Sequence, residues 1–189
     1  NILSLSGPQV LAVKTVNLDT VGVRISKIFR NNLLPFLNNE YGAPFAKQVY
    51  DGVYRVESGE INEEVSQRIG LAAFQKEPYK GLFQVEVYDP KEYYRRETGW
   101  FLCTDLGLVA KQSGDDLWVW AVTVKDVRAA EGVKVDLMSD TNQAMDSQVT
   151  DAAGRAVFEN WRKHPYKFNP YFLVARREDD FSFLFFQRT

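Results

Sequence analysis

A dense run of apolar positions between Gly99 and Val124 is interrupted by a short polar segment. From Trp100 to Lys111 nearly every residue other than Thr, Asp or Gly is apolar, and after Gln-Ser-Gly-Asp-Asp the run resumes as Leu-Trp-Val-Trp-Ala-Val-Thr-Val. Aromatic and β-branched residues pack well on a pleated, half-buried surface, and Gly, Ser and Asp suit a tight turn. The apolar positions do not recur at helical spacing. The pattern therefore predicts a β-hairpin of two long strands.

Two tryptophans mark the second strand of this hairpin. Trp118 and Trp120 flank Val119, and we expect them on opposite faces of their sheet. One should lie in the core and the other at a domain interface or on the surface.

The first half of the chain shows the same strand-like patterning with less clarity. Strands are predicted at Val10–Val16, at Val21–Ser26, where apolar residues alternate with polar ones, and at Gly81–Tyr88. A fourth strand, Val49–Glu57, is expected to break near Asp51-Gly52. Residues 31–39 predict one helical turn with Asn32 as its N-cap, and 65–74 is compatible with a strand or a short helix.

The second half has an even rhythm of short strands. After the hairpin, apolar segments follow at 133–138, 143–150, 156–158, 171–176 and 181–186, and turn residues separate them. Seven strands at roughly 8–12-residue spacing are typical of an immunoglobulin-like sandwich. The sequence thus predicts an all-β protein of two tandem immunoglobulin-like antiparallel β-sandwich domains.

The charged segment Asp89-Pro-Lys-Glu-Tyr-Tyr-Arg-Arg-Glu-Thr is the predicted boundary between the two domains. It gives domains of residues 1–92 and 93–189. If the segment is an open linker, trypsin should cut at Arg95-Arg96 and leave two folded pieces.

Composition excludes several classes of function. The 189 residues are 45% hydrophobic and 25% charged, and the formal net charge of -2 gives no reason to expect binding to nucleic acid or anionic membranes. No apolar run approaches the length of a membrane span. The single cysteine, Cys103, permits no internal disulfide or zinc cluster, and its apolar strand predicts a small buried hydrophobe. The chain begins at Asn1 without Met, which suggests a piece of a longer protein.

Candidate chemistry is sparse. His164 lies in a Pro-bounded loop with no other His or Cys near it in the sequence, and the acidic pairs fall in turns where carboxylates serve backbone hydrogen bonds. A calcium loop at Asp140, Asn142 and Asp146 lacks the EF-hand spacing. No nucleophile elbow, phosphate-binding loop or zinc-protease motif is present. We therefore predict no catalytic, cofactor-binding or metal-binding residue, no cofactor and no enzymatic activity. The acidic pairs are Glu63-Glu64, Asp115-Asp116 and Asp179-Asp180.

Five sequence blocks of the second half resemble the bacterial α2-macroglobulin family. Thr104-Asp-Leu-Gly-Leu-Val-Ala-Lys-Gln is similar to the family's "TDIGL" strand, and Asp115-Asp-Leu-Trp-Val-Trp-Ala-Val-Thr-Val resembles the strand that follows it. The other three blocks begin at Glu131 (EGVKVDLMSD), Gln148 (QVTDAAGRAVF) and Phe172 (FLVARREDDFSFL). In the first half, VNLDTVGVRISKIFRNNL and the Gly-Leu-Phe-x-Val-x-Val strand also suit the family.

The resemblance implies two consecutive macroglobulin domains from the N-terminal half of a large periplasmic protease trap, whose full-length form is expected to be anchored to the inner membrane as a lipoprotein. In the family, cleavage of a bait segment collapses the molecule, and in many members a thioester then captures the protease. The thioester motif Cys-x-Glu-Gln is absent here, and Cys103 is followed by Thr104-Asp-Leu, so it is neither that cysteine nor a lipid anchor. The implied role is a scaffold. Its expected partners are other domains of the same chain, target proteases and cell-wall synthesis machinery, but not nucleic acid.

A different class of protein fits the same β-rich pattern. Tandem immunoglobulin-like domains also build bacterial adhesins and surface stalks that bind protein or glycan. Trp161, Tyr166, Phe168 and Tyr171 are the aromatic residues that would form such a site; the alternative is that they cover the end of the sandwich. An accessory module of a carbohydrate-active enzyme is a third interpretation.

Overall fold

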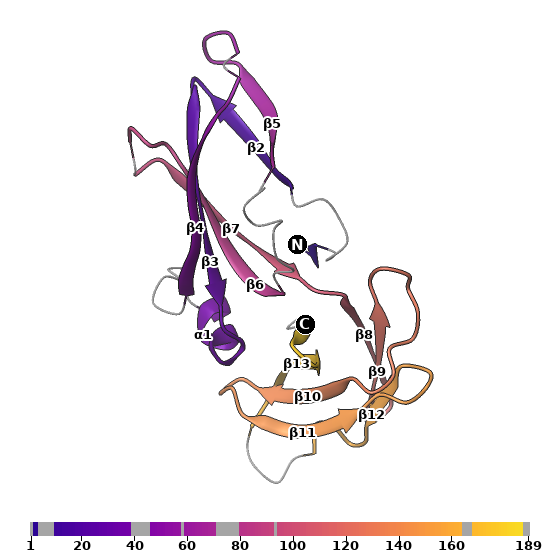
Figure 1. The fold of residues 1–189 in the computed structure, drawn as a ribbon. Helices are drawn as coiled ribbons and strands as arrows, with labels where there is room; N and C mark the ends of the chain where they lie inside the picture. Colours follow the sequence, from indigo (N-terminus) through magenta and orange to yellow (C-terminus); the bar gives the residue numbers. More distant parts are fainter. Residues whose placement is uncertain are drawn as a thin grey trace. The chain divides into compact units, whose positions relative to one another are not determined.

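The computed structural model describes residues 2–3, 10–38, 46–57, 59–70, 80–92, 94–163 and 168–186. The chain divides into two compact units, which we call unit 1 (Asn1–Cys103) and unit 2 (Thr104–Thr189). Within the described ranges, every regular element is a β-strand apart from a 3-10 helix, η1 (Arg30–Asn32), and helix α1 (Leu33–Asn38) (Figure 1). The predicted all-β fold class is therefore confirmed.

The described residues of unit 1 form seven strands in two sheets. The larger sheet has the order β1-β7-β6-β3-β4, and the smaller sheet pairs β2 with β5. All of these neighbours are antiparallel except β1, which pairs in parallel with β7. The strands are β1 (Ile2–Leu3), β2 (Val10–Val16), β3 (Thr20–Ile28), β4 (Ala46–Arg55), β5 (Glu64–Gly70), β6 (Gly81–Tyr88) and β7 (Arg96–Cys103).

The core of unit 1 lies between its two sheets. Alternate residues of each strand face inward, as the period of two requires, so that Val13 of β2 and Ile69 of β5 pack on Ile25 and Phe83 of the larger sheet. Cys103 belongs to this core and is fully buried, which confirms its predicted character as a small hydrophobe.

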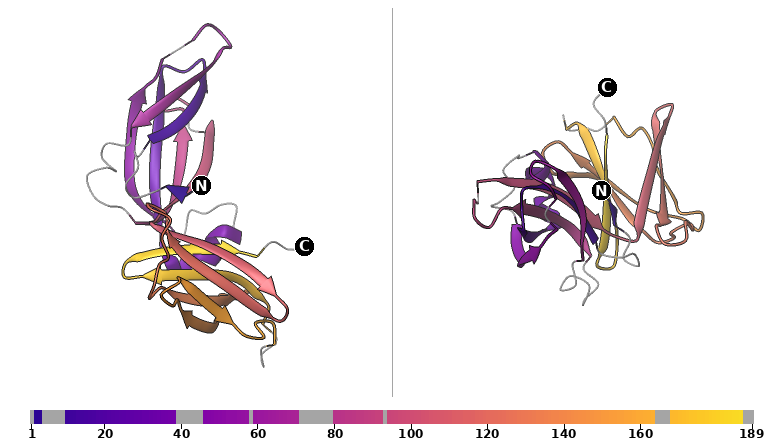
Figure 2. Two further views of the ribbon diagram at one scale, coloured as in Figure 1. Left: turned by 90° about the vertical axis from the view of Figure 1, so that its right-hand side faces the viewer. Right: turned by 90° about the horizontal axis from the view of Figure 1, so that it is seen from above.

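In unit 2 the part of the chain that the structure describes also forms seven strands, in sheets of four and three. The four-stranded sheet has the order β11-β10-β13-β14 and the three-stranded sheet the order β12-β9-β8. Side chains from both sheets form one core, and the sheets can be followed in two further views (Figure 2). The strands are β8 (Leu106–Ser113), β9 (Asp116–Thr123), β10 (Lys134–Ser139), β11 (Ala144–Val149), β12 (Arg155–Phe158), β13 (Pro170–Arg177) and β14 (Asp180–Phe185).

The two units share one topology and differ in their first strand. In chain order, β3, β4, β6 and β7 of unit 1 correspond to β10, β11, β13 and β14 of unit 2, and the pair β2-β5 corresponds to β9-β12. The first strand of unit 1, β1, lies beside the last strand of the larger sheet, whereas the first strand of unit 2, β8, lies beside β9 in the smaller sheet. The described strands therefore make a 5+2 arrangement in unit 1 and a 4+3 arrangement in unit 2.

Unit 1 ends later in the chain than the predicted boundary at residues 92/93. Strand β7 pairs with β6 along its whole length, from Tyr88↔Arg96 to Gly81↔Cys103, and the units divide between Cys103 and Thr104. The charged segment that precedes β7 is thus a turn inside one sheet and not a linker. Cleavage at Arg95-Arg96 would therefore break the chain between two paired strands of one sheet.

The predicted hairpin is correct only in its second part. Strands β8 and β9 form it around a turn at Gly114-Asp115, but Trp100–Cys103 belongs to β7 because Phe101 and Cys103 face the core of unit 1. The expectation for the two tryptophans is wrong. Trp118 and Trp120 are two residues apart and share one face, where their rings stack with centroids 6.2 Å apart, while Val119 between them is fully buried.

Three smaller expectations change in unit 1. Strand β4 runs through Asp51-Gly52 without a break, since both residues pair with β3. The ambiguous segment after Val65 is strand β5 as far as Gly70, and 71–79 lies outside the described residues. Asn32 is the last residue of η1 and directly precedes α1, so helical structure begins earlier than predicted, at Arg30. Among the described residues, no helix is long and apolar enough to cross a membrane.

Candidate functional site

The acidic pairs chosen from the sequence make separate hydrogen bonds and ion pairs, and no pair forms a joint site. Asp116 accepts the backbone N–H of Asn160 at 3.0 Å, while its neighbour Asp115 forms an ion pair with Lys163, whose hydrogen bond lowers the pKa of Asp115. In the same way, Glu63 accepts the backbone N–H of Glu60 at 3.0 Å, and Glu64 pairs with Lys14 at 2.7 Å.

The carboxylates of the possible calcium loop also make local hydrogen bonds. Asp140 accepts the side-chain amide of Asn169 at 3.2 Å, and Asp146 accepts the backbone N–H of Ser147 at 2.6 Å. Within the part of the chain that the structure describes, no group of three or more His, Cys, Asp or Glu side chains gathers as a metal site would require. His164 lies outside the described residues.

Asp180 has a role that sequence reasoning missed. Its carboxylate is 6% exposed and accepts two hydrogen bonds, from the hydroxyl of Thr104 at 2.7 Å and from the backbone N–H of Asp105 at 3.0 Å. The Thr104 hydroxyl in turn accepts the N–H of Leu106 at 3.0 Å. The first and last of the five motif blocks therefore meet here, and Asp180 at the start of β14 holds the chain where unit 2 begins. The sequence signal, Asp179-Asp180, did not show which carboxylate is buried.

A second motif block forms the turn between β11 and β12. Thr150 is 3% exposed; its hydroxyl donates to the carbonyl of Ala130 at 2.6 Å and accepts the N–H of Val133 at 2.9 Å. Asp151 accepts the backbone N–H groups of Ala153 and Arg155, both at 2.9 Å. The Arg155 backbone hydrogen bond is the main reason why the pKa of Asp151 lies below its usual value. These contacts fix the turn, as expected for acidic turn residues.

Gly154 closes this turn at a position that no other residue fits. Its φ is +70°, and a Cβ on it would lie 2.5 Å from the carbonyl oxygen of Ala121 in β9. The N–H of Ala121 also donates a hydrogen bond to the carbonyl of Gly154 at 2.8 Å. The close approach therefore ties the turn to the neighbouring strand.

A hollow of about 640 Å³ lies in unit 1 beside strand β2. It is lined by five consecutive residues of β2, Ala12–Val16, and by residues 94–97, the last two of which are the first residues of β7. Among the apolar lining residues, Val13 and Val21 are at most 8% exposed. We therefore treat this hollow as a candidate binding surface.

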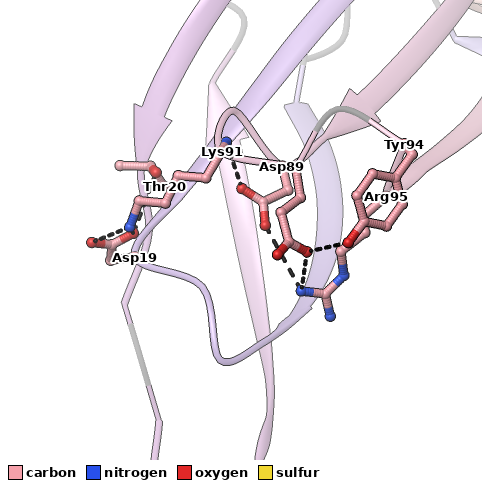
Figure 3. Close-up of polar contacts among 7 residues, drawn as sticks. Asp19, Thr20, Asp89, Lys91, Tyr94 and Arg95 are labelled. Atoms are coloured by element: carbon pink, nitrogen blue, oxygen red, sulfur yellow. Dashed lines mark hydrogen bonds and ion pairs between the residues drawn. The ribbon is translucent and has the colours of Figure 1, made fainter.

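Polar contacts order the turn at the edge of the hollow (Figure 3). Asp89 is 5% exposed and accepts the backbone N–H of Lys91 at 2.8 Å, while the Lys91 ammonium reaches Asp19 at 3.1 Å and lowers the pKa of that carboxyl. Glu92 accepts from the Tyr94 hydroxyl at 3.0 Å, which raises the pKa of the phenol, and from Arg95 at 3.3 Å. The turn is therefore held by its own side chains.

The described aromatic residues considered for a glycan or protein site differ in exposure. Trp161 is 5% exposed and belongs to the core of unit 2, where its ring lies 5.0 Å from that of Phe186. Phe168 is 39% exposed, and Tyr171 is half-buried against Phe172 and Phe185. Tyr166 lies outside the described residues.

Comparisons with known proteins agree with this geometry. Residues 103–189 match the family model of the bacterial alpha-2-macroglobulin MG3 domain. The whole chain is 26% identical to alpha-2-macroglobulin of Rickettsia conorii, and 97% of it is 22% identical to an alpha-2-macroglobulin homolog of Yersinia pestis. The crystal structure of native Escherichia coli alpha-2-macroglobulin spanning domains NIE-MG1 is similar with a TM-score of 0.76 and 18% identity, covering 92% of this chain and 86% of that one.

The fold thus defines a tandem of macroglobulin-type β-sandwich domains. The resemblance that the motifs predicted is confirmed: residues 103–189 are a domain of the bacterial α2-macroglobulin family, and the chain as a whole is similar to members of that family. The chain spans 11% of the length of each of these two curated relatives.

Proposed function

We propose that this chain is a non-catalytic scaffold in an α2-macroglobulin-like protease inhibitor, where it helps to enclose a protease after cleavage of a bait segment. The proposal rests on the contacts that the motif residues make within unit 2. Thr104, Asp180, Thr150, Asp151 and Gly154 join strands and fix turns, and their polar atoms are engaged by the domain itself. Such residues define a rigid building block and offer no reactive group to a substrate.

The same proposal includes the surroundings expected from the family resemblance. Other domains of a longer chain are its direct partners, target proteases meet it through the full-length protein, and cell-wall synthesis machinery is a further candidate partner. The full-length protein is proposed to be periplasmic and anchored to the inner membrane as a lipoprotein. Cell fractionation and incorporation of labelled palmitate into the full-length protein test that placement.

The decisive experiment uses the full-length native protein. It is incubated with labelled methylamine and, separately, with a protease, and covalent adducts and retained cleavage products are measured. Methylamine uptake with protease adducts is the result for a thioester trap, and cleavage at one segment with protease retained but no adduct is the result for a trap that works by enclosure. Absence of both cleavage and adducts refutes the inhibitor function.

A variant of the same protein tests the scaffold role. Asp180→Ala weakens the junction at the start of unit 2 and should lower the amount of protease retained, while methylamine uptake, which reports any thioester located elsewhere, stays unchanged. Asp179→Ala, at the exposed neighbouring position, is the matched control. Equal retention by both variants contradicts a scaffold role for unit 2.

The adhesin alternative loses the residue on which it most depended. Trp161 packs inside unit 2 and is 5% exposed, so it is not available to a glycan. If the chain binds glycans on an array and Trp161→Phe does not change this binding, the adhesin alternative would hold with a different binding surface.

A further inference from the structure

The smaller sheet of unit 1 has an edge that its counterpart in unit 2 does not have. In unit 2, β8 runs antiparallel to β9 along its whole length, from Leu106↔Thr123 to Ser113↔Asp116. Strand β2, the counterpart of β9, pairs with β5 on one side from Val10↔Gly70 to Val16↔Glu64. On its other side no strand of the described ranges pairs with it, because β1 lies beside β7 instead.

The position next to this edge is the hollow of about 640 Å³. It follows β2 over five residues, Ala12–Val16, which is most of the strand, and Val21 and Val87 of the larger sheet also line it. Asp89, Arg95 and Glu97 line it as well. The hollow therefore has both apolar and polar lining residues and runs along a strand.

Such a surface matches one kind of ligand. The edge of a strand presents a row of N–H and C=O groups that another extended backbone can pair. Strand β8 shows which side chains suit this position. Leu106, Leu108 and Ala110 pack on the core of unit 2, whereas Val109, between the last two, and Lys111, after them, are exposed. An occupant of the hollow should show the same alternation of apolar and polar residues.

We propose that unit 1 accepts an extended polypeptide segment from outside residues 1–189, which adds to β2 as the third strand of its smaller sheet. A protein of this family has many such segments, since the chain spans 11% of the length of its curated relatives. The proposal goes beyond the protease-trap function and does not depend on it. Strand addition at β2 is a property of unit 1 whether or not the parent protein inhibits proteases.

The test uses the 189-residue chain and a peptide with the sequence of residues 105–114, DLGLVAKQSG, which contains β8. Amide hydrogen exchange followed by NMR reads each strand separately. Amides on the outer edge of β2 should exchange at least tenfold more slowly with the peptide present. Amides of β9 are the internal control, because β8 already covers that edge. The same peptide with Leu108→Pro should have no effect, since proline lacks the N–H and interrupts a strand.

Two valine variants locate the binding surface. Val16 lines the hollow and is 40% exposed, and Val53 of β4 is exposed by 59% and does not line it. Val16→Glu should weaken peptide binding at least tenfold, whereas Val53→Glu should leave it unchanged. Far-UV circular dichroism of both variants confirms that the fold is retained.

Three outcomes overturn the proposal. Exchange in β2 that is unaffected by the peptide up to about 1 mM, a weak-binding limit, shows that the edge accepts no strand. Outer-edge amides of β2 that are already protected in the dilute free chain show that the chain covers its own edge. Protection that appears only as protein concentration rises, together with a dimer in analytical ultracentrifugation, assigns the edge to a second copy of the chain.

Discussion

Asp180→Ala removes the carboxylate that joins the start of unit 2 to its last strand. Two donors lose their acceptor: the hydroxyl of Thr104, which is fully buried, and the backbone N–H of Asp105. A third contact depends on the first, because the Thr104 hydroxyl is positioned to accept the N–H of Leu106. Alanine at this position restores none of these contacts.

The size of the effect follows from the two direct hydrogen bonds. A hydrogen bond to a charged group contributes about 1.5–3 kcal/mol, and a buried donor left without an acceptor costs about 1–3 kcal/mol. The variant also avoids the cost of burying a carboxylate, which offsets part of the sum. We therefore expect the free energy of unfolding of unit 2 to fall by about 3 kcal/mol. Asp180→Asn should lie between wild type and alanine, because it keeps one acceptor oxygen and turns an amide N–H₂ toward the second donor.

The assay is urea unfolding followed by tryptophan fluorescence. Three of the four tryptophans, Trp118, Trp120 and Trp161, lie in unit 2, so Trp100→Phe in every variant makes the signal report unit 2 alone. With a urea dependence of about 2 kcal/mol per M, the midpoint should fall by about 1.5 M. The control Asp179→Ala should stay within about 0.5 kcal/mol of wild type, as most surface substitutions do.

The reasoning is refuted if the midpoint of Asp180→Ala equals that of Asp179→Ala. A double-mutant cycle with Thr104→Val gives an independent check, since two side chains that share a buried hydrogen bond should couple by about 0.5–3 kcal/mol. Additive effects would mean that the observed contact contributes nothing to stability.

Three further predictions concern unit 2. Gly154→Ala should destabilise unit 2 by more than Gly114→Ala. Both glycines have positive φ, but only at Gly154 would the new Cβ meet a backbone oxygen, that of Ala121. The urea midpoints of the two variants should differ by the equivalent of at least about 1 kcal/mol. Trp161→Ala should cost about 3–5 kcal/mol, while Trp161→Phe should cost clearly less, because it keeps the buried ring and removes an indole N–H that has no hydrogen-bond partner. Asp151→Ala should lower the melting temperature at pH 7. Because folding lowers the pKa of this carboxyl, the difference in melting temperature from wild type should shrink as pH falls below about 4. A difference that is constant from pH 7 to pH 2 contradicts the hydrogen-bonding role.

The strands of unit 2 were predictable because most of them are short segments rich in apolar residues, with residues of turn chemistry between them. The turn at Asp151–Gly154 is an example, since Asp and Gly serve there for the reasons that their chemistry suggests. The error over Trp118 and Trp120 was avoidable, because residues two apart on a strand share a face, and Val119 was the core residue between them. The buried role of Asp180 was not predictable in this way. Adjacent aspartates in a turn look alike until the strand pairing shows which one faces Thr104.

The boundary between the units was hidden for a related reason. Charge, a proline and paired arginines at residues 89–96 are typical of a linker, and they are equally typical of an exposed turn between two antiparallel strands. What distinguishes the two cases is the partner of the next strand, and for β7 that partner is β6, which precedes it. The apolar run from Trp100 onward crosses the true boundary because each unit needs an apolar strand on its side, and only the polar pair Thr104-Asp105 separates them.

The partner of the first described strand of each unit was also not predictable from the sequence. The larger sheets have the same neighbours in both units, so the inward-facing residues of β3, β6 and β7 have equivalents in β10, β13 and β14. An edge strand, however, can be satisfied by either sheet, because it needs only one row of backbone partners. The same topology allows both cases. In unit 1 the two residues Ile2 and Leu3 lie beside β7, and in unit 2 a full strand of eight residues, Leu106–Ser113, lies beside β9. The choice leaves the core of each unit intact and changes only which strand edge stays open. Among the described strands, β2 therefore keeps one edge without a strand partner, and the alternation of residues within the other strands does not predict this.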